Sequence, residues 1–213
     1  MSFRAVFLGL LLFVVLGGGG LAWSGWNAVS GFVDKVESKR KICSTLDEAE
    51  RLDLVGVDTP KEQWNLDGSL GRYTCRWATE DFETVPTFVE VVSVPADTWA
   101  ELTRSELASR VVAGSDLRRV GQLLKAADKP EMTASDGCRV ARMLFEFTGA
   151  ARGADRVVAP AGSNSTGAPS ILAQSCVDGT YSAVLVTAPG LKIDHSLARK
   201  TARALRAVEE RVG

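Results

Sequence analysis

The sequence has little of what metal and redox sites need. Its only histidine is His195, and none of its four cysteines forms a Cys-x-x-Cys pair. Structural zinc sites and thioredoxin-like redox motifs take several such ligands at short spacing. The sequence therefore predicts no metal site, and no motif in it indicates a cofactor.

Basic charge is also scarce beyond the N-terminal end. Residues 1–41 hold five basic and two acidic side chains, and the rest of the chain holds 20 basic and 24 acidic ones, a net charge of −4. Proteins that bind nucleic acid neutralise phosphates with clusters of Lys and Arg. A mildly acidic domain without such a cluster is not expected to bind nucleic acid.

Charge of either sign is absent from residues 5–33. Residues 5–23 are almost all apolar and long enough to cross the hydrocarbon core of a bilayer, which takes roughly 20 residues of helix. Trp23 and Trp26 follow, where interfacial aromatic residues usually lie. We therefore predict that residues 1–33 form a membrane anchor or signal segment that contacts the lipid bilayer through residues 5–33.

Other fates of this segment fit parts of the sequence. Small residues at Gly20–Ala22 and Ala28–Ser30 have the separation found at signal-peptide cleavage sites, so cleavage is the main alternative to a retained anchor. A buried core helix fits less well, because the segment has no polar face. Lipid attachment would need a cysteine directly after the apolar run, whereas the first cysteine is Cys43. We favour a retained anchor.

The four cysteines are even in number and widely spaced, which indicates two structural disulfides. Four cysteines allow three pairings. We expect the sequential one, Cys43–Cys75 and Cys138–Cys176. Cys43 precedes a predicted helix whose neighbour in the chain is the strand that holds Cys75, and the second pair repeats this arrangement in reverse. The alternative is four buried free thiols.

Two signals for the orientation of the domain disagree. Residues 34–41, a charged juxtamembrane linker, hold four basic residues, against Arg4 and the amino terminus on the other side of the apolar segment. The positive-inside rule alone would leave the domain in the cytoplasm. Disulfides persist outside the cytosol, and we give them the greater weight. The prediction is a single-pass cell-membrane protein with an extracytoplasmic domain.

Hydrophobic periodicity and capping signals predict an α+β fold for residues 42–213, with one antiparallel sheet covered by helices. The expected order is helix, strand, strand, helix, twice over, which would give two related halves, 42–114 and 115–213. Residues 57–70 and 149–170 are expected to be loops. The predicted elements are helices Thr45–Leu54 (capped by Ser44), Thr98–Val112, Asp116–Ala127 (capped by Ser115) and Asp194–Val212, and strands Arg72–Ala78, Thr87–Val94, Arg139–Phe147 and Thr180–Thr187.

The surroundings of the first cysteine pair resemble a known family. Cys43 opens the first helix, Gly-x-Tyr-x-Cys-x-Trp occupies residues 71–77, and a Val-rich strand and a later cysteine pair follow. This pattern resembles an actinobacterial family of extracytoplasmic, often lipoprotein-borne, domains of unknown function with a Cys…Cys-x-Trp signature. The resemblance covers residues 43–99. It implies an α+β sandwich in the cell envelope and no defined activity, and this chain departs from it by lacking a lipoprotein cysteine.

No group of side chains predicts catalysis. Asp194, His195 and Ser196 are adjacent at a helix start, where neighbouring side chains point apart, so a helix cap is expected in place of a catalytic triad. The acidic residues within 80–83 are expected in a solvated turn. Three tryptophans are expected to fill the core, and not to line a ligand groove: Trp64, Trp77 and Trp99.

These observations favour a non-enzymatic binding module of the cell envelope, held by one membrane helix. Its expected partner is an unknown protein or a small-molecule ligand. Two alternatives stay open: an envelope hydrolase whose catalytic residues come from scattered loops, and a regulatory partner of another membrane protein.

Overall fold

The computed structural model describes residues 41–67, 71–79, 87–110, 117–129, 131–163 and 168–212. The predicted apolar segment, all of the linker except Lys41, the predicted cap Ser115 and the acidic residues at 80–83 lie outside these ranges. Within the described ranges, no helix is long and apolar enough to span a membrane.

The core of the fold is one six-stranded sheet in which every neighbouring pair of strands is antiparallel. The strand order is β1-β2-β3-β6-β5-β4, so the two halves of the chain meet at the central pair β3 and β6. The predicted α+β class is confirmed. The strands are β1 (Lys61–Asp67), β2 (Arg72–Ala78), β3 (Phe88–Pro95), β4 (Arg156–Ser163), β5 (Pro169–Val177) and β6 (Thr180–Thr187).

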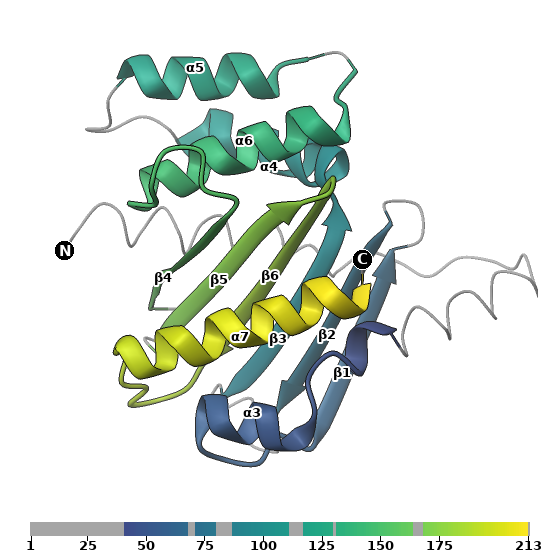
Figure 1. The fold of residues 1–213 in the computed structure, drawn as a ribbon, viewed down its shortest axis with the longest axis vertical. Helices are drawn as coiled ribbons and strands as arrows, with labels where there is room; N and C mark the ends of the chain where they lie inside the picture. The colour runs from purple at the N-terminus through teal and green to yellow at the C-terminus, as the bar shows by residue number, and fades with distance from the viewer. Residues whose placement is uncertain are drawn as a thin grey trace, which may run out of the picture.

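Helices α3 (Glu48–Val55) and α7 (His195–Val212) cover one face of the sheet, which we call the first face (Figure 1). Asp47 caps α3 in a capping box with Glu50, and the left-handed Gly56 ends the helix. The apolar side of α7 packs on this face because Leu197, Leu205 and Val208 recur at helical spacing. Valines of the central strands face these residues.

Helices α4 (Ala96–Arg110), α5 (Leu117–Ala127) and α6 (Ala134–Phe147) lie on the opposite side, at the end of the sheet where β3 ends and β6 begins (Figure 1). Trp99 of α4 stacks on Tyr181 of β6 with ring centroids 4.4 Å apart. The Tyr181 hydroxyl donates to Gln174 Oε1 at 2.7 Å, so its buried oxygen is satisfied. Burial raises the pKa of Tyr181 far above its usual range.

Apart from α5, which lies between them, the two halves of the chain have the same order of elements: α3, three strands and α4, then α6, three strands and α7. A half-turn about the normal to the sheet would place β1, β2 and β3 on β4, β5 and β6, because β3 and β6 are antiparallel neighbours at the centre of the sheet. The same rotation keeps each face on its own side, yet α3 covers the first face and α6 covers the second. The halves therefore share their strand order and differ in which face their helices cover.

The strand predicted at Arg139–Phe147 is wrong, because these residues belong to helix α6. Ala141, Met143, Phe145 and Phe147 alternate as in a strand, but the buried positions of the helix follow helical spacing. The decisive local signal is the capping box in which Thr133 and Asp136 satisfy each other's backbone N–H groups.

Both predicted loops contain strands, so these predictions are wrong as well. Strand β1 lies within residues 57–70, and β4 and the start of β5 lie within residues 149–170. In β1, apolar residues alternate with polar ones only at Trp64 and Leu66, between charged residues at both ends, while β4 carries Pro160 and a register shift between Pro160 and Gly162. Both are edge strands, where proline, charge and irregularity are tolerated and strand signals are weak.

Two helix starts also differ from the prediction. Asp47, and not Ser44, caps α3, because the Ser44 hydroxyl donates to the carbonyl of Lys41 instead. Helix α4 begins at Ala96, directly after β3, so Thr98 already lies inside the helix. The strands Arg72–Ala78 and Thr180–Thr187 are confirmed as predicted. The strand predicted at Thr87–Val94 and the helices predicted at Asp116–Ala127 and Asp194–Val212 are confirmed to within one residue.

Candidate functional site

The four cysteines form the two disulfides of the sequential pairing. Cys43–Cys75 joins the turn before α3 to β2, with Cα atoms 5.3 Å apart, and Cys138–Cys176 joins α6 to β5 at 5.2 Å. Each bond ties a helical segment to the middle strand of its own half, on opposite faces of the sheet. Such bonds persist in oxidising compartments, so their presence indicates an extracytoplasmic environment.

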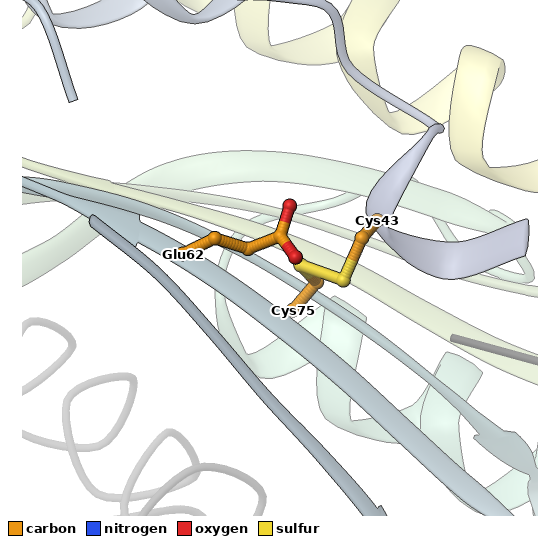
Figure 2. A group of neighbouring side chains, drawn as sticks. All are labelled: Cys43, Glu62 and Cys75. Carbon is orange, nitrogen blue, oxygen red and sulfur yellow. A yellow bond between two sulfur atoms is a disulfide. The ribbon is translucent and has the colours of Figure 1, made fainter. Parts of the chain in front are cut away.

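The first disulfide has a carboxylate beside it. Figure 2 shows Glu62 of β1 pointing toward the bond, and one of its oxygens lies within 4.8 Å of both sulfur atoms. Two sulfurs and a carboxylate have the composition of a metal site, but a metal ligand has to be a thiolate, and both sulfurs are committed to the covalent bond. The oxidised chain therefore offers no metal site here.

The stretch of sequence between the two cysteines of this disulfide holds three exposed apolar side chains. Leu52 of α3 is 48% exposed, Val57 in the segment after α3 is 45% exposed, and Trp64 of β1 is 43% exposed. In Figure 1, α3 lies near the lower end of the sheet, whose edge strand is β1. We call the stretch from Leu52 to Trp64, which also holds Val57 and Glu62, the α3–β1 corner.

Trp64 departs from the expectation that the tryptophans fill the core. Trp77 and Trp99 are 2% and 1% exposed and do so, whereas Trp64 stands on the outermost strand of the sheet. It pairs in register with Cys75, so its side chain is on the first face beside the disulfide. An exposed tryptophan on a rigid strand is the residue type that most often dominates protein–protein contacts.

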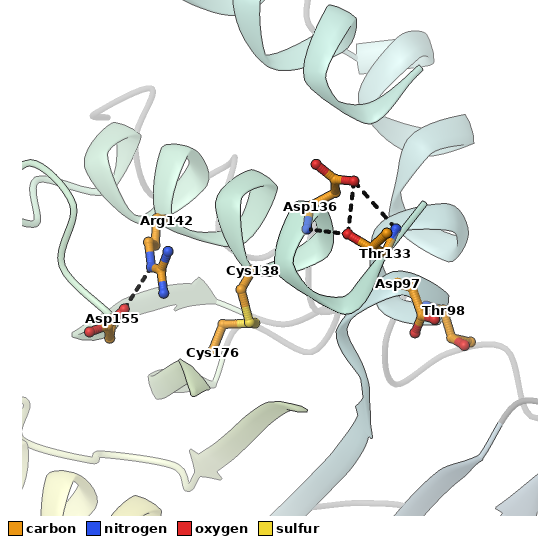
Figure 3. The surroundings of a disulfide bond; sticks show 8 residues. All are labelled: Asp97, Thr98, Thr133, Asp136, Cys138, Arg142, Asp155 and Cys176. Atoms are coloured by element: carbon orange, nitrogen blue, oxygen red, sulfur yellow. Dashed lines mark hydrogen bonds and ion pairs between the residues drawn. A yellow bond between two sulfur atoms is a disulfide. The ribbon is translucent and has the colours of Figure 1, made fainter. Parts of the chain in front are cut away.

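The polar side chains around the second disulfide hold helix α6 in place (Figure 3). Asp136 accepts from the Thr133 hydroxyl at 2.9 Å and pairs with Lys129 Nζ at 2.6 Å. These donors, Lys129 first, lower the pKa of Asp136 to about 2. Arg142 donates to Asp155 at 2.6 Å and fixes the loop between α6 and β4 to the helix. Together these bonds hold the start and the end of the helix that carries Cys138.

A buried ion pair lies in the middle of the sheet. Glu90 of β3 is 1% exposed, and its carboxylate accepts from the guanidinium of Arg76, its cross-strand partner in β2. The Arg76 guanidinium also lies over the ring of Phe88, 4.6 Å from its centroid. Burial raises the pKa of Glu90, and the neighbouring charge of Arg76 opposes that rise.

Glu90 is not among the site residues that the sequence predicts. A signal is present in the sequence, because an acidic residue stands inside the buried run Thr87–Val94, and a buried acid needs a partner. Register identifies that partner as Arg76. A single carboxylate beside the guanidinium of Arg76 and the charge of Arg72 is not the pair of carboxylates that glycoside hydrolysis takes, so Glu90 and Arg76 are best explained as part of the packed sheet.

Asp194, His195 and Ser196 form a helix cap, as expected. Asp194 accepts from the backbone N–H groups of Ser196 and Leu197 at 2.8 and 2.9 Å. These bonds lower the pKa of Asp194. His195 is exposed at the first position of α7, and the Asp194 carboxylate is directed at the backbone of the helix. This arrangement is a cap and not a nucleophilic relay.

The fold and the bonds define a class of protein: a disulfide-bonded α+β domain built on a six-stranded antiparallel sheet. Comparison of the chain with models of protein families, with curated proteins and with solved structures found no match. The resemblance to the actinobacterial family accordingly rests on the cysteine and tryptophan pattern of residues 43–99 alone.

Proposed function

We propose that this chain is a membrane-anchored envelope protein whose disulfide-bonded domain works outside the cytoplasm as a non-enzymatic binding module. Residues 5–33 would supply the anchor, since they carry no charge over a length that spans a bilayer. The pair of closed disulfides favours the outer side of the membrane over the cytoplasmic side. The resemblance to actinobacterial envelope domains agrees with both points.

The partner in this proposal is a protein that contacts the α3–β1 corner. The observation that carries it is the exposure of Leu52, Val57 and Trp64 within a stretch of 13 residues, although these are the residue types that folding usually buries. Trp64 would be the central contact, with Leu52 and Val57 at its side. A protein partner embedded in the same membrane would make this chain a regulatory or structural subunit.

Enzymatic roles have less support. Among the described residues, the carboxyl groups whose pKa is displaced from its usual value are Asp194 in a helix cap, Asp136 in a capping box and Glu90 in a buried ion pair. Each has a structural explanation. An envelope hydrolase built from scattered loops is therefore the second choice.

Site-specific photo-crosslinking in intact cells tests the binding proposal. Benzoylphenylalanine would replace Trp64 in the full chain, and Arg152, an exposed residue in the turn after α6, would take the same group as the matched control. We expect one protein adduct from position 64 and none from position 152. No adduct at position 64, or the same adducts at both positions, would reject the α3–β1 corner as the contact surface.

The location is tested separately. Protein isolated from membranes and denatured without reductant should react with no thiol reagent, and protease added to intact cells with an opened outer barrier should cleave the domain. Four reactive thiols, or full protection of the domain, would reject the extracytoplasmic assignment whatever the crosslinking shows.

A further inference from the structure

Helix α7 concentrates the positive charge of the domain. Its 18 residues hold five basic and two acidic side chains, whereas residues 42–213 as a whole hold 20 basic and 24 acidic ones. Both acids are in the last turn of the helix, and one of them, Glu209, is engaged by two nitrogen atoms of Arg156 at 2.9 and 2.8 Å. The outer surface of α7 is therefore cationic although the domain is acidic.

Three arginines form one line on the side of α7 that faces away from the sheet. The buried residues of the helix, from Leu197 to Val208, recur at helical spacing on the opposite side. Arg199, Arg203 and Arg206 follow one another at intervals of four and three residues, and all three are exposed. In Figure 1, α7 crosses the strands on the outer side of the first face. The line of arginines therefore points away from the molecule.

Little negative charge compensates this line. Asp53 of α3 lies 3.8 Å from Arg203, but it also pairs with Lys200 at 2.5 Å, and the side chain of Arg203 stays 65% exposed. Within the described part of the chain, Arg199 and Arg206 form no hydrogen bond or ion pair. One carboxylate is thus shared between two cations, and two further arginines have no acidic partner there.

The chain enters the domain beside the C-terminal end of α7. Arg211 donates to the carbonyl oxygens of Ser44 and Thr45 at 2.8 and 2.5 Å. The neighbouring Ile42 is buried in the core on the first face, which α7 covers. The eight residues 34–41 between the proposed anchor and the domain span at most about 28 Å when fully extended. An anchor in the bilayer would therefore keep the end of α7 close to the membrane surface.

We propose that the line of Arg199, Arg203 and Arg206 docks on the anionic lipid surface of the membrane that holds the anchor. This inference rests on the proposed membrane anchor. Guanidinium groups match the phosphate oxygens of lipid headgroups, and a short tether makes the contact an intramolecular one at a high effective concentration. Every exposed residue of α7 is polar or charged, so the helix contacts headgroups and does not insert into the hydrocarbon.

Photo-crosslinking to lipid tests the docking on the full chain. Benzoylphenylalanine replaces Ser196, an exposed neutral residue one turn before Arg199. The matched control carries it at Gln122, an exposed neutral residue of α5, on the other side of the sheet. Both proteins are reconstituted into vesicles of phosphatidylcholine, alone or in an equimolar mixture with phosphatidylglycerol. We expect lipid adducts at position 196 in the anionic vesicles, and only background at position 196 in the neutral vesicles and at position 122 in both.

Two double substitutions test the arginines themselves. Arg199→Gln with Arg206→Gln should lower the adduct yield at position 196 at least about tenfold, because each basic residue near an anionic surface strengthens binding roughly fivefold. Lys125→Gln with Arg152→Gln removes the same charge from exposed positions outside α7 and should keep a yield close to that of the parent. Because salt screens exposed charges, the adducts of the parent should also be lost in about 1 M salt.

Equal yields at position 196 from anionic and neutral vesicles, or equal effects of the two double substitutions, would overturn the docking. Flotation of the vesicles distinguishes this result from a failure of the anchor. A chain that floats with the vesicles and gives no adduct at position 196 rejects the docking alone. A chain that floats with neither kind of vesicle rejects the anchor, and the docking with it.

Discussion

Gly137 of α6 lies directly against the backbone of Ala96, the first residue of α4. A Cβ atom on Gly137 would stand 2.1 Å from the Ala96 carbonyl oxygen and 2.3 Å from its carbonyl carbon. Backbone atoms cannot rotate away as a side chain does, so the absence of a side chain at Gly137 is what lets these two helices touch. The contact is made one residue before Cys138, so it also positions the second disulfide.

Gly137→Ala should therefore destabilise the protein by about 3 kcal/mol or more, because α4 and α6 have to separate to admit the methyl group. Gly121→Ala is the matched control, since nothing lies within 4 Å of a Cβ at Gly121 of α5. Alanine is a better helix former than glycine, so this control should gain about 0.5–1 kcal/mol. Urea unfolding followed by circular dichroism measures both. Equal effects of the two substitutions would contradict the close contact.

Arg76→Met should cost much more stability than Glu90→Gln. The first change leaves a buried carboxylate without its ion-pair partner and with only the nearby charge of Arg72, a loss of about 3–5 kcal/mol. Glu90→Gln removes the negative charge together with the cost of its desolvation, and the glutamine carbonyl can still accept a hydrogen bond from Arg76. Urea unfolding of both variants would show the asymmetry.

The Arg76→Met variant should also depend on pH in a defined direction. Without the guanidinium, the pKa of Glu90 in the folded state rises further above that of the unfolded chain, so the folded state binds the proton more strongly. Stability is then highest at low pH and falls as the pH rises through the folded pKa. The variant should be closer in stability to the parent at pH 5 than at pH 8. A loss that is the same at both pH values would show that Glu90 is not the cause.

Asp136 titrates in the opposite sense. Its pKa is about 2 in the folded chain, below the value of an unfolded aspartate, so its ionised form favours folding. That contribution is fully present above about pH 4 and disappears as the pH falls through about 2. The stability difference between the parent and Asp136→Asn should be constant from neutral pH to pH 4 and vanish toward pH 2. Acid titrations of the two proteins, followed by tryptophan fluorescence, provide the measurement.

Removal of the Cys138–Cys176 bond by a double alanine substitution should cost about 4 kcal/mol, since the bond closes a loop with a sequence separation of 38. Removal of Cys43–Cys75, with a separation of 32, should cost nearly the same in this model. Thermal unfolding of the two variants would compare them. A large inequality would indicate that residual structure in the unfolded chain, and not loop length, sets the contributions.

The sequence predicts the parts of this fold whose signals are local. The alternation of Arg72–Ala78 and the helical stripe of Asp194–Val212 are readable because each element buries one face. The sequential disulfide pairing was predicted correctly, although each bond passes over one strand that the sequence did not predict, β1 in the first half and β4 in the second. Edge strand β1 was hard to predict, because its ladder with β2 is a long-range property of the sheet and only two of its seven residues, Trp64 and Leu66, are apolar.

The candidate surface was harder to predict than the fold. Nothing in the sequence separates exposed Trp64 from buried Trp77, because the difference is the position of each strand in the sheet. The approach of Glu62 to the first disulfide likewise depends on the register of β1 against β2. In α6, the residues 139–147 satisfy both periods, and only the capping box upstream distinguishes helix from strand.

The sequential pairing of the cysteines has a consequence for how the chain matures. When a chain emerges N-terminus first from a translocation pore, Cys43 and Cys75 leave it well before Cys138 does, and they can be oxidised while they have no other partner. Cys138 and Cys176 would then have only each other as partners, so we expect the native bonds to form in order without reshuffling. Strand β3 still has to wait for β6, its neighbour in the middle of the sheet, which lies beyond the last cysteine. We therefore expect covalent closure to precede completion of the sheet, so that the first half is already constrained when β3 pairs with β6.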